Sequence, residues 1–581
     1  MIRARITLAF VLAIVLGGCG GVRPAVPLVP IKLIAINDFH GHLAAPDSVV
    51  VLTDERGKPA SVPLGGAAYL ATLSSRLAAE NPRHVIVGAG DLISASPLES
   101  ALFHDETTVR ALDAIGLEWT SVGNHEFDRG AENLLRIQNG GCAKDGVPGE
   151  TTCLDGRYGG AHYRYLAANV LDSRTGKPLF PAYGIKQFQT PAGQISIAFI
   201  GLVLKSTPDL VIRKGITGLT FADEADTVNS LLPELHAKGI NAVIVLIHQG
   251  GESSGGYNDH HCPDFRGDIV DVVNRLDPAV SAVISAHTHN AYICQLESRV
   301  AGRSILVTSA GKYGQFVTDL DLQIDPATDR IVSMNANNLP VVNDRSGNTA
   351  PERYPALAAN PAVAAIVDAA SARVGPLADA VAGWLQADLY AQTDLAGESS
   401  LGEVIADAQL EATLASDSGG AQIAFVNETG VRADLRRKVP GYTVNYGQLY
   451  TAQPFKNYLV TMTLTGAQLR SLLEAQWQSN QRRNMLQPSR SFSYAWRASA
   501  PQGQRIDPAS MRLRGEPIQA DGHYRVTVNN FLANGGDGFT TFRDGVEVHE
   551  LELTDLEALQ RYLKHWSPVP APEPGRIVRR D

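Results

Sequence analysis

Five apolar runs in the first 290 residues each stop at a polar residue that can bind a metal ion. The runs are short and continuous in hydrophobic residues, which predicts buried strands, and they cover residues 32–36, 84–87, 119–122, 242–247 and 282–286. Ligands in open α/β sheets gather at the carboxyl ends of strands. The pattern therefore predicts an α/β domain with its chemistry at one edge of the sheet.

The polar residues at these strand ends form one candidate metal site. Its seven members are Asp38, His40, Asp91, Asn124, His248, His287 and His289. Mixed nitrogen and oxygen donors without thiolate suit divalent zinc, manganese, iron or cobalt. Seven donors are too many for one tetrahedral ion and about right for two ions that share a bridging carboxylate. A structural role explains any single member, but five strand ends of this kind together favour a dinuclear site.

The third strand leads into Gly123-Asn124-His125-Glu126-Phe127-Asp128, which adds an imidazole and a carboxylate to the amide. Taken alone, these six residues are equally compatible with a polar turn in which Asn124 and Asp128 cap a helix. The other four strand ends favour a catalytic interpretation.

Length and charge limit the possible functions. A chain of 581 residues predicts at least two sizeable domains. A net charge of -10 without a basic stripe excludes a general duplex nucleic-acid binder.

The N-terminus has the order of a bacterial export signal. Arg3 and Arg5 precede the apolar run 8–16, and Leu16-Gly17-Gly18-Cys19 resembles a lipobox. We expect residues 1–19 to be a lipoprotein signal peptide, Cys19 to be lipidated, and residues 20–30 to tether the protein to a membrane on the periplasmic or cell-surface side. The alternative is ordinary secretory cleavage with Cys19 incidental.

The other four cysteines predict two disulfides, since their number is even and the chain is expected to be exported. Of three possible pairings we favour Cys142 with Cys153 and Cys262 with Cys294. The first pair closes a short glycine-rich loop. A zinc site is less favoured because no Cys-x-x-Cys spacing occurs.

The strand-end series Asp38-x-His40, Gly90-Asp91, Gly123-Asn124-His125-Glu126, His248 and Ala286-His287-x-His289 resembles the calcineurin-type metallophosphoesterase pattern. The resemblance implies a four-layer catalytic domain over residues 31–340. It implies that Asp38, His40, Asp91 and His289 hold one metal and that Asp91, Asn124, His248 and His287 hold the other. His125 would be the catalytic histidine that binds no metal, oriented by Asp128.

The composition changes near Leu339, where Pro, Gly and polar residues precede an Ala/Val-rich stretch at helical spacing over 362–374. We expect residues 341–378 to be a linker and connecting helix, residues 379–566 a second α/β domain, and residues 567–581 a tail. The tail could be disordered or a contact surface, and we assign it no function.

The second domain resembles the C-terminal domain of the 5'-nucleotidase family. The resemblance implies that Phe455 and Phe531 sandwich a nucleobase, Asn427 contacts the base, Asp537 binds ribose and Arg432 binds phosphate. Two departures stand out. The chain has Asn427-Glu428-Thr429-Gly430 where many relatives have a glycine-rich Asn-x-Gly-Gly loop, so Glu428 puts negative charge near an anionic substrate. Gly397 stands where some nucleotidases have arginine.

The sequence therefore predicts an exported two-metal phosphohydrolase, foremost a 5'-nucleotidase that releases phosphate from nucleotides by metal-hydroxide attack on phosphorus. The alternatives on the same scaffold are a 2',3'-cyclic-nucleotide phosphodiesterase, a UDP-sugar hydrolase, a thiosulfohydrolase or an exonuclease. The non-enzymatic alternative is a catalytically inactive surface-binding lipoprotein.

Overall fold

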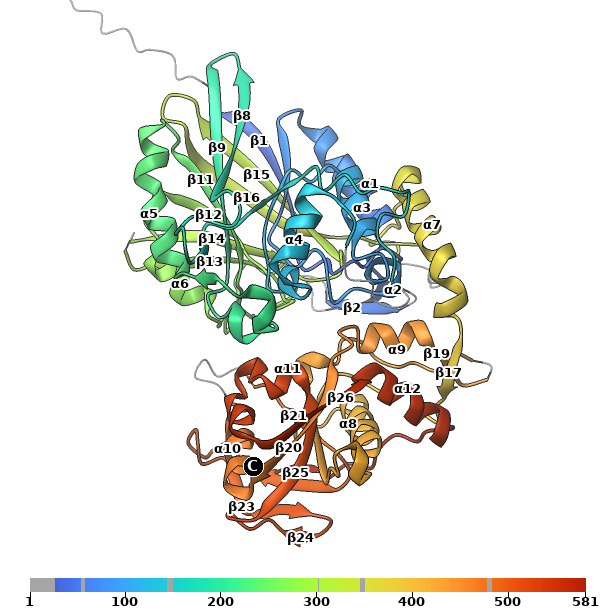
Figure 1. The fold of residues 1–581 in the computed structure, drawn as a ribbon. Coiled ribbons are helices and arrows are strands. Elements are labelled where there is room, and N and C mark those ends of the chain that lie inside the picture. The colour runs from blue at the N-terminus through green and yellow to red at the C-terminus, as the bar shows by residue number, and fades with distance from the viewer. Residues whose placement is uncertain are drawn as a thin grey trace, which may run out of the picture.

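The computed structural model describes residues 27–46, 48–53, 58–143, 150–300, 302–344, 351–439, 441–477 and 483–581. The predicted signal peptide with Cys19, and most of the predicted tether, lie outside the described residues. Within the described part of the chain, no helix is long and apolar enough to cross a membrane. Two halves follow one another along the chain, with α7 (Pro361–Ala378) between them (Figure 1).

Two six-stranded sheets form the centre of the first half. The first sheet has the order β16 (Arg330–Pro340), β15 (Phe316–Asp325), β1 (Val29–Ile36), β4 (His84–Gly88), β5 (Trp119–Ser121) and β6 (Arg164–Leu166). The second has the order β13 (Ala291–Ser298), β14 (Arg303–Ala310), β12 (Val280–Ile284), β11 (Ala242–His248), β9 (Gly193–Val203) and β8 (Tyr183–Thr190). The five predicted strands are β1, β4, β5, β11 and β12.

Parallel pairing aligns the chemistry-bearing strand ends. β1 pairs with β4 and β4 with β5 in parallel in the first sheet, and β11 pairs with β12 in parallel in the second. Parallel neighbours end at the same edge of a sheet, so the polar residues that follow these strands meet there.

Helices cover the outer face of each sheet. The first sheet is covered by α1 (Ala67–Glu80), α3 (Glu106–Ile115) and α4 (Gly130–Asn139), and the second by α5 (Glu224–Ala237) and α6 (Ile269–Arg275) (Figure 1). A separate apolar cluster between the sheets contains Leu33, Phe199 and Leu246. The four-layer prediction is therefore confirmed.

The second half is built on one five-stranded sheet. Its order is β21 (Leu486–Pro488), β18 (Ile423–Asn427), β25 (His523–Asn529), β20 (Tyr458–Thr465) and β26 (Val546–Thr554). The helices α8 (Ser400–Thr413) and α12 (Asp555–Trp566) pack together beside it. The predicted second α/β domain is thus present.

Apolar contacts join the halves through α7. The Asn360 side chain caps the start of α7 by accepting from the backbone N–H groups of Ala362 and Val363. Side chains of α7 lie in one apolar cluster with α2 (Leu98–Ala101) of the first half and α9 (Tyr446–Ala452) of the second. This packing sets the two halves face to face.

Both predicted disulfides are confirmed: Cys142 bonds Cys153, and Cys262 bonds Cys294. The C-terminal tail, however, is an ordered part of the second half. Its strand β27 (Ile577–Arg579) pairs with β22 (Phe492–Trp496), and the Arg576 guanidinium donates to both Asp407 carboxylate oxygens at 2.9 Å. The disordered alternative for this segment was wrong because a buried ion pair anchors it.

Candidate active site

The strand ends bring six of the seven candidate donors into two adjacent groups. In one group, His289 Nε2 lies 3.5 Å from Asp38 Oδ1 and 3.1 Å from His40 Nε2. In the other, ligand atoms of Asp91, His248 and His287 all lie within 4.8 Å of one another. The family resemblance implies the same division, with Asp91 also in the first group and Asn124 also in the second.

Asp91 lies between the groups. Its Oδ2 is 2.9 Å from His248 Nε2 and 3.7 Å from His40 Nε2, so one carboxylate oxygen faces a member of each group. Its Oδ1 accepts from the backbone N–H of His125 at 2.9 Å. This geometry fits a carboxylate that bridges two ions.

One candidate donor atom is left without a hydrogen-bond partner, as an atom that binds a metal would be. The Oδ1 of Asn124 is buried and has no hydrogen-bond partner. Burial lowers the pKa of both His40 and His289, so their Nε2 atoms face one another as neutral imidazole nitrogens. Buried polar atoms without partners are costly. The nitrogen and oxygen donor set therefore fits divalent ions.

Contacts of the other ring nitrogens fix two of the histidines. The His40 Nδ1 lies 3.0 Å from the carbonyl oxygen of Ser94, and the His248 Nδ1 lies 2.9 Å from that of Ala89. A ring N–H that donates to a carbonyl leaves Nε2 free as the ligand atom. The Asp38 carboxylate is held likewise, because Asn37 Nδ2 donates to its Oδ2 at 2.8 Å.

The backbone is strained at the same residues. Asp38, His40, Asp91, His287 and His289 all have left-handed φ values, between 47° and 73°. Residues other than glycine rarely adopt this conformation, and such strain concentrates at functional sites. The turns after these strands therefore place their side chains in the site at a cost in local backbone stability.

Glu126 is a site residue that the sequence analysis did not single out. Its buried carboxylate accepts from the backbone N–H groups of Asp91 at 2.8 Å, Leu92 at 2.9 Å and Gly123 at 2.5 Å. It thereby ties the loop after β4 to the loop after β5. The only signal in the sequence was its place beside His125.

His125 and Asp128 form a pair beside the metal-ligand groups. The His125 Nδ1 lies 2.8 Å from Asp128 Oδ2 across one turn, η1 (His125–Phe127). Burial opposes protonation of His125, but the charges of Asp128 and Asp91 raise its pKa above the ordinary value. The pair can hold a proton close to the site.

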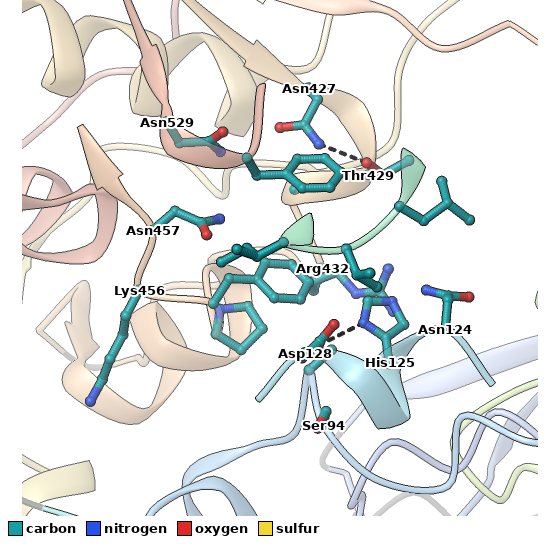
Figure 2. Close-up of a pocket in the computed structure, with 18 of the residues that line it drawn as sticks. Ser94, Asn124, His125, Asp128, Asn427, Thr429, Arg432, Lys456, Asn457 and Asn529 are labelled. Carbon is teal, nitrogen blue, oxygen red and sulfur yellow. Dashed lines mark hydrogen bonds and ion pairs between the residues drawn. The ribbon is translucent and has the colours of Figure 1, made fainter. Parts of the chain in front are cut away.

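The second half covers the edge of the first half at which the candidate donors lie. Arg432 Nη2 reaches to 3.4 Å from His40 Nε2, and the Phe455 ring stacks on the His125 ring with centroids 5.7 Å apart. Figure 2 shows Arg432 beside His125 and Asp128, with Asn427, Asn457 and Asn529 approaching the cavity from the second half. One cavity of about 1250 Å³ contains these groups.

The five predicted substrate residues all line this cavity: Asn427, Arg432, Phe455, Phe531 and Asp537. The Asn427 Nδ2 donates to Asp537 Oδ2 at 2.8 Å, and Thr429, which the sequence analysis did not include, donates to the same oxygen. A Cβ on Gly536 would lie 2.5 Å from the Phe531 ring, so the ring packs where only glycine leaves room.

The two departures from the family pattern have local explanations. The Glu428 carboxylate does not line the large cavity but accepts from Met485 N at 3.1 Å and Thr393 Oγ1 at 3.2 Å beside a neighbouring hollow. The same hollow is lined by His287, a candidate metal ligand, so the expected proximity of the Glu428 charge to the phosphate site stays a prediction. Gly397 has φ +105°, a backbone conformation that residues with a side chain rarely adopt, so an arginine would be strained there.

Comparisons with known proteins agree with this architecture. Residues 31–291 match the model of the calcineurin-like phosphoesterases, and residues 374–544 match that of the 5'-nucleotidase C-terminal domain. A solved 5'-nucleotidase precursor from Thermus thermophilus superimposes with a TM-score of 0.75 at 26% identity, over 95% of this chain and 99% of that one.

Two curated relatives are similar over most of the chain. The endonuclease YhcR of Bacillus subtilis is 29% identical over 94% of this chain. The match spans 41% of the length of that relative. The cell wall protein Lmo0130 of Listeria monocytogenes is 29% identical over 93% of this chain and 68% of its own.

Proposed function

The chain belongs to the calcineurin-like phosphoesterases that carry a 5'-nucleotidase C-terminal domain, a family of metal-dependent phosphoester hydrolases, and from this we propose that it is a nucleotidase. The observation that carries the proposal is the position of Asp91 Oδ2 between two groups of imidazole and carboxylate donors. Asp91 also lines a cavity shared by both halves.

The proposed metal ligands are Asp38, His40, Asp91 and His289 for one ion and Asp91, Asn124, His248 and His287 for the other. Two divalent ions held there would supply Lewis-acid charge and lower the pKa of water. The remaining chemistry belongs to side chains of the protein.

Arg432 orients the phosphoryl group, because its planar guanidinium reaches the edge of the metal-ligand cluster and suits bidentate contact with phosphate oxygens. His125 gives its proton to the departing ribose oxygen, and Asp128 holds the imidazole in the orientation for that transfer. Arg432 and His125 would thus act on the oxygen atoms where negative charge develops in the transition state.

The nucleoside would be bound by the second half. Phe455 and Phe531 offer aromatic faces to a base, and stacking of this kind accepts any base. Asp537 and Asn427 lie at the same wall, where the carboxylate can accept from ribose hydroxyls. The phosphate would then lie at the metal-ligand cluster.

Phosphodiester cleavage is the second candidate. A cavity of about 1250 Å³ is larger than a mononucleotide needs, and it extends past Phe455 to Tyr450 and Glu557. A 2',3'-cyclic nucleotide, a UDP-sugar or the end of an oligonucleotide would fit within the same chemistry.

We propose further that the protein is exported and anchored through Cys19. Two disulfides favour an oxidising compartment, and one relative is named a cell wall protein. Replacement of Cys19 by alanine should release the protein from the membrane fraction, and retention there would contradict the anchor.

A substrate panel tests the proposed activity. Nucleoside monophosphates, 2',3'-cyclic nucleotides, UDP-sugars and NAD would each be assayed for phosphate or nucleoside release with manganese, zinc and cobalt. Fastest turnover of 5'-monophosphates supports the nucleotidase, faster turnover of diesters supports the second candidate, and no metal-dependent turnover overturns both.

A further inference from the structure

A buried carboxylate of the first half, Glu150, contacts the second half directly. Its Oε1 lies 3.1 Å from the ammonium nitrogen of Lys456, and only 2% of the Glu150 side chain is exposed. Lys456 is a quarter exposed and follows Phe455 in the loop after α9. The ion pair therefore lies at the boundary between the halves, next to a proposed base-stacking residue.

On the first-half side, Glu150 is fixed by several contacts. Its Oε2 lies 2.8 Å from Arg129 Nη1 and 2.8 Å from His104 Nε2. Burial opposes its ionisation, but His104, Arg129 and Lys456 hold the pKa of this carboxyl well below its ordinary value. Glu150 is thus a fixed negative charge that the first half presents to Lys456.

The chain around Glu150 is anchored as well. The next residue, Thr151, donates from its backbone N–H to the carbonyl oxygen of Leu102 at 2.8 Å. The backbone N–H of Cys153 donates to Glu106 Oε2 at 2.9 Å, and the disulfide ties Cys153 to Cys142. The carboxylate is therefore held to the same framework as the catalytic pair, since Arg129 directly follows Asp128.

On the second-half side, the backbone of Lys456 is strained. Its φ is +53°, a left-handed value that costs a lysine free energy and must be offset by contacts. The ammonium nitrogen lies 5.6 Å from the centre of the Tyr450 ring as well as near Glu150. Figure 2 shows Lys456 extending away from Asn427 and Arg432.

Successive residues of this loop thus reach two different parts of the first half. Phe455 stacks on His125, and Lys456 pairs with Glu150. We propose that Lys456 and Glu150 are positioning residues, whose ion pair holds the Phe455 loop against the His125–Asp128 pair and so favours substrates that carry a nucleoside. This inference rests on the proposed nucleotidase function.

Lys456 is the better residue to change. Its removal leaves Glu150 paired with Arg129 and His104, so no buried charge is stranded. Removal of Glu150 would instead leave Arg129 without its buried partner, which is strongly destabilising. Lys456→Met also keeps most of the aliphatic side chain.

The test compares two substrates in full-length, metal-loaded protein. For Lys456→Met we expect kcat/KM for a nucleoside 5'-monophosphate to fall about tenfold to a hundredfold, and that for p-nitrophenyl phosphate, which has no nucleoside, to stay within about twofold. Lys456→Arg should restore most of the loss. The matched control is Lys238→Met, which removes an exposed lysine paired with Glu234 at 2.6 Å.

The outcomes separate this inference from the proposed function. Equal losses on both substrates, or no loss on either, would overturn the positioning role. Calorimetric binding of a nucleoside monophosphate to metal-free protein adds a readout that needs no turnover, and Lys456→Met should weaken it about tenfold. Wild-type protein that binds nucleotide but does not hydrolyse it when loaded with metal would refute the nucleotidase alone, whereas absence of binding both with and without metal would overturn both.

Discussion

The ring of Phe455, in the second half, stacks on the ring of His125, in the first, at 5.7 Å and an interplanar angle of 15°. A residue proposed to hold the base therefore touches the residue proposed to protonate the leaving group. Phe455 and His125 line one cavity together with Asp91 and Asn124. Recognition and chemistry consequently depend on the same arrangement of the two halves.

Replacement of His125 by alanine tests the proposed proton donor. Since positioned general acids contribute about 10²- to 10⁴-fold, kcat should fall by that factor with little change in KM. Metal content, measured by inductively coupled plasma mass spectrometry, should not change because His125 is not a proposed ligand. The control is His162→Ala, whose side chain is 89% exposed. Undiminished turnover would refute the assignment.

Replacement of Asp91 by asparagine tests the bridge. The amide keeps the shape and can still accept from His125 N, but it lacks the charge that faces both groups of donors. Bound metal should fall below two ions per chain, and kcat should fall by about a hundredfold or more as charge stabilisation is lost. Asp172→Asn, at the end of the short strand β7 (Val170–Asp172), should change neither quantity. Full metal content in Asp91→Asn would contradict a bridging role.

Replacement of Phe531 by alanine tests the stacking platform. Base stacking contributes about 1–3 kcal/mol, so KM for nucleotides should rise about 5- to 150-fold. Hydrolysis of p-nitrophenyl phosphate serves as the control, because that substrate has no base. A parallel loss on both substrates would show that Phe531 acts on the fold and not on the nucleoside.

The carboxyl of Glu403 should make the free energy of unfolding depend on pH. Burial raises its pKa to about 8, although Arg576 opposes the shift, and its Oε1 has no hydrogen-bond partner. Between about pH 5 and pH 8 the unfolded chain has lost this proton and the folded chain retains it, so the free energy of unfolding should decrease as pH rises through that window.

Glu403→Gln should remove that decrease, which amounts to up to about a few kcal/mol between pH 5 and pH 8. The free energy of unfolding would be measured by urea denaturation across this pH range. The exposed Glu516→Gln change is the control. An unchanged pH dependence in Glu403→Gln would show that this carboxyl is ionised in the folded protein at neutral pH.

Much of the candidate metal site could be predicted because the signal is local. Each buried strand is apolar, and its donor follows at once, as in His248 at the end of β11. Asp91 and Asn124 could be grouped because parallel strands end at one edge. Such patterns depend only on hydrophobic periodicity and on the direction of the strands.

The missed contacts depend on three-dimensional neighbours. The role of Glu126 exists only because β4 and β5 are adjacent, so that its carboxylate reaches the N–H groups of the loop that holds Asp91. The Glu150–Lys456 pair joins residues 306 positions apart and follows from how the halves pack. The partners of the Glu428 carboxylate, Met485 N and Thr393 Oγ1, are likewise set by parts of the chain distant in sequence.

The most direct measurement is a metal titration followed by both binding and turnover. Metal-stripped protein would be titrated with Mn²⁺ while bound ions are counted and phosphate release from a nucleoside 5'-monophosphate is recorded. The account predicts that activity appears as two ions bind per chain, and that His125→Ala binds two ions yet stays slow. Full activity without bound metal, or two bound ions without phosphate release from any nucleotide, would contradict it.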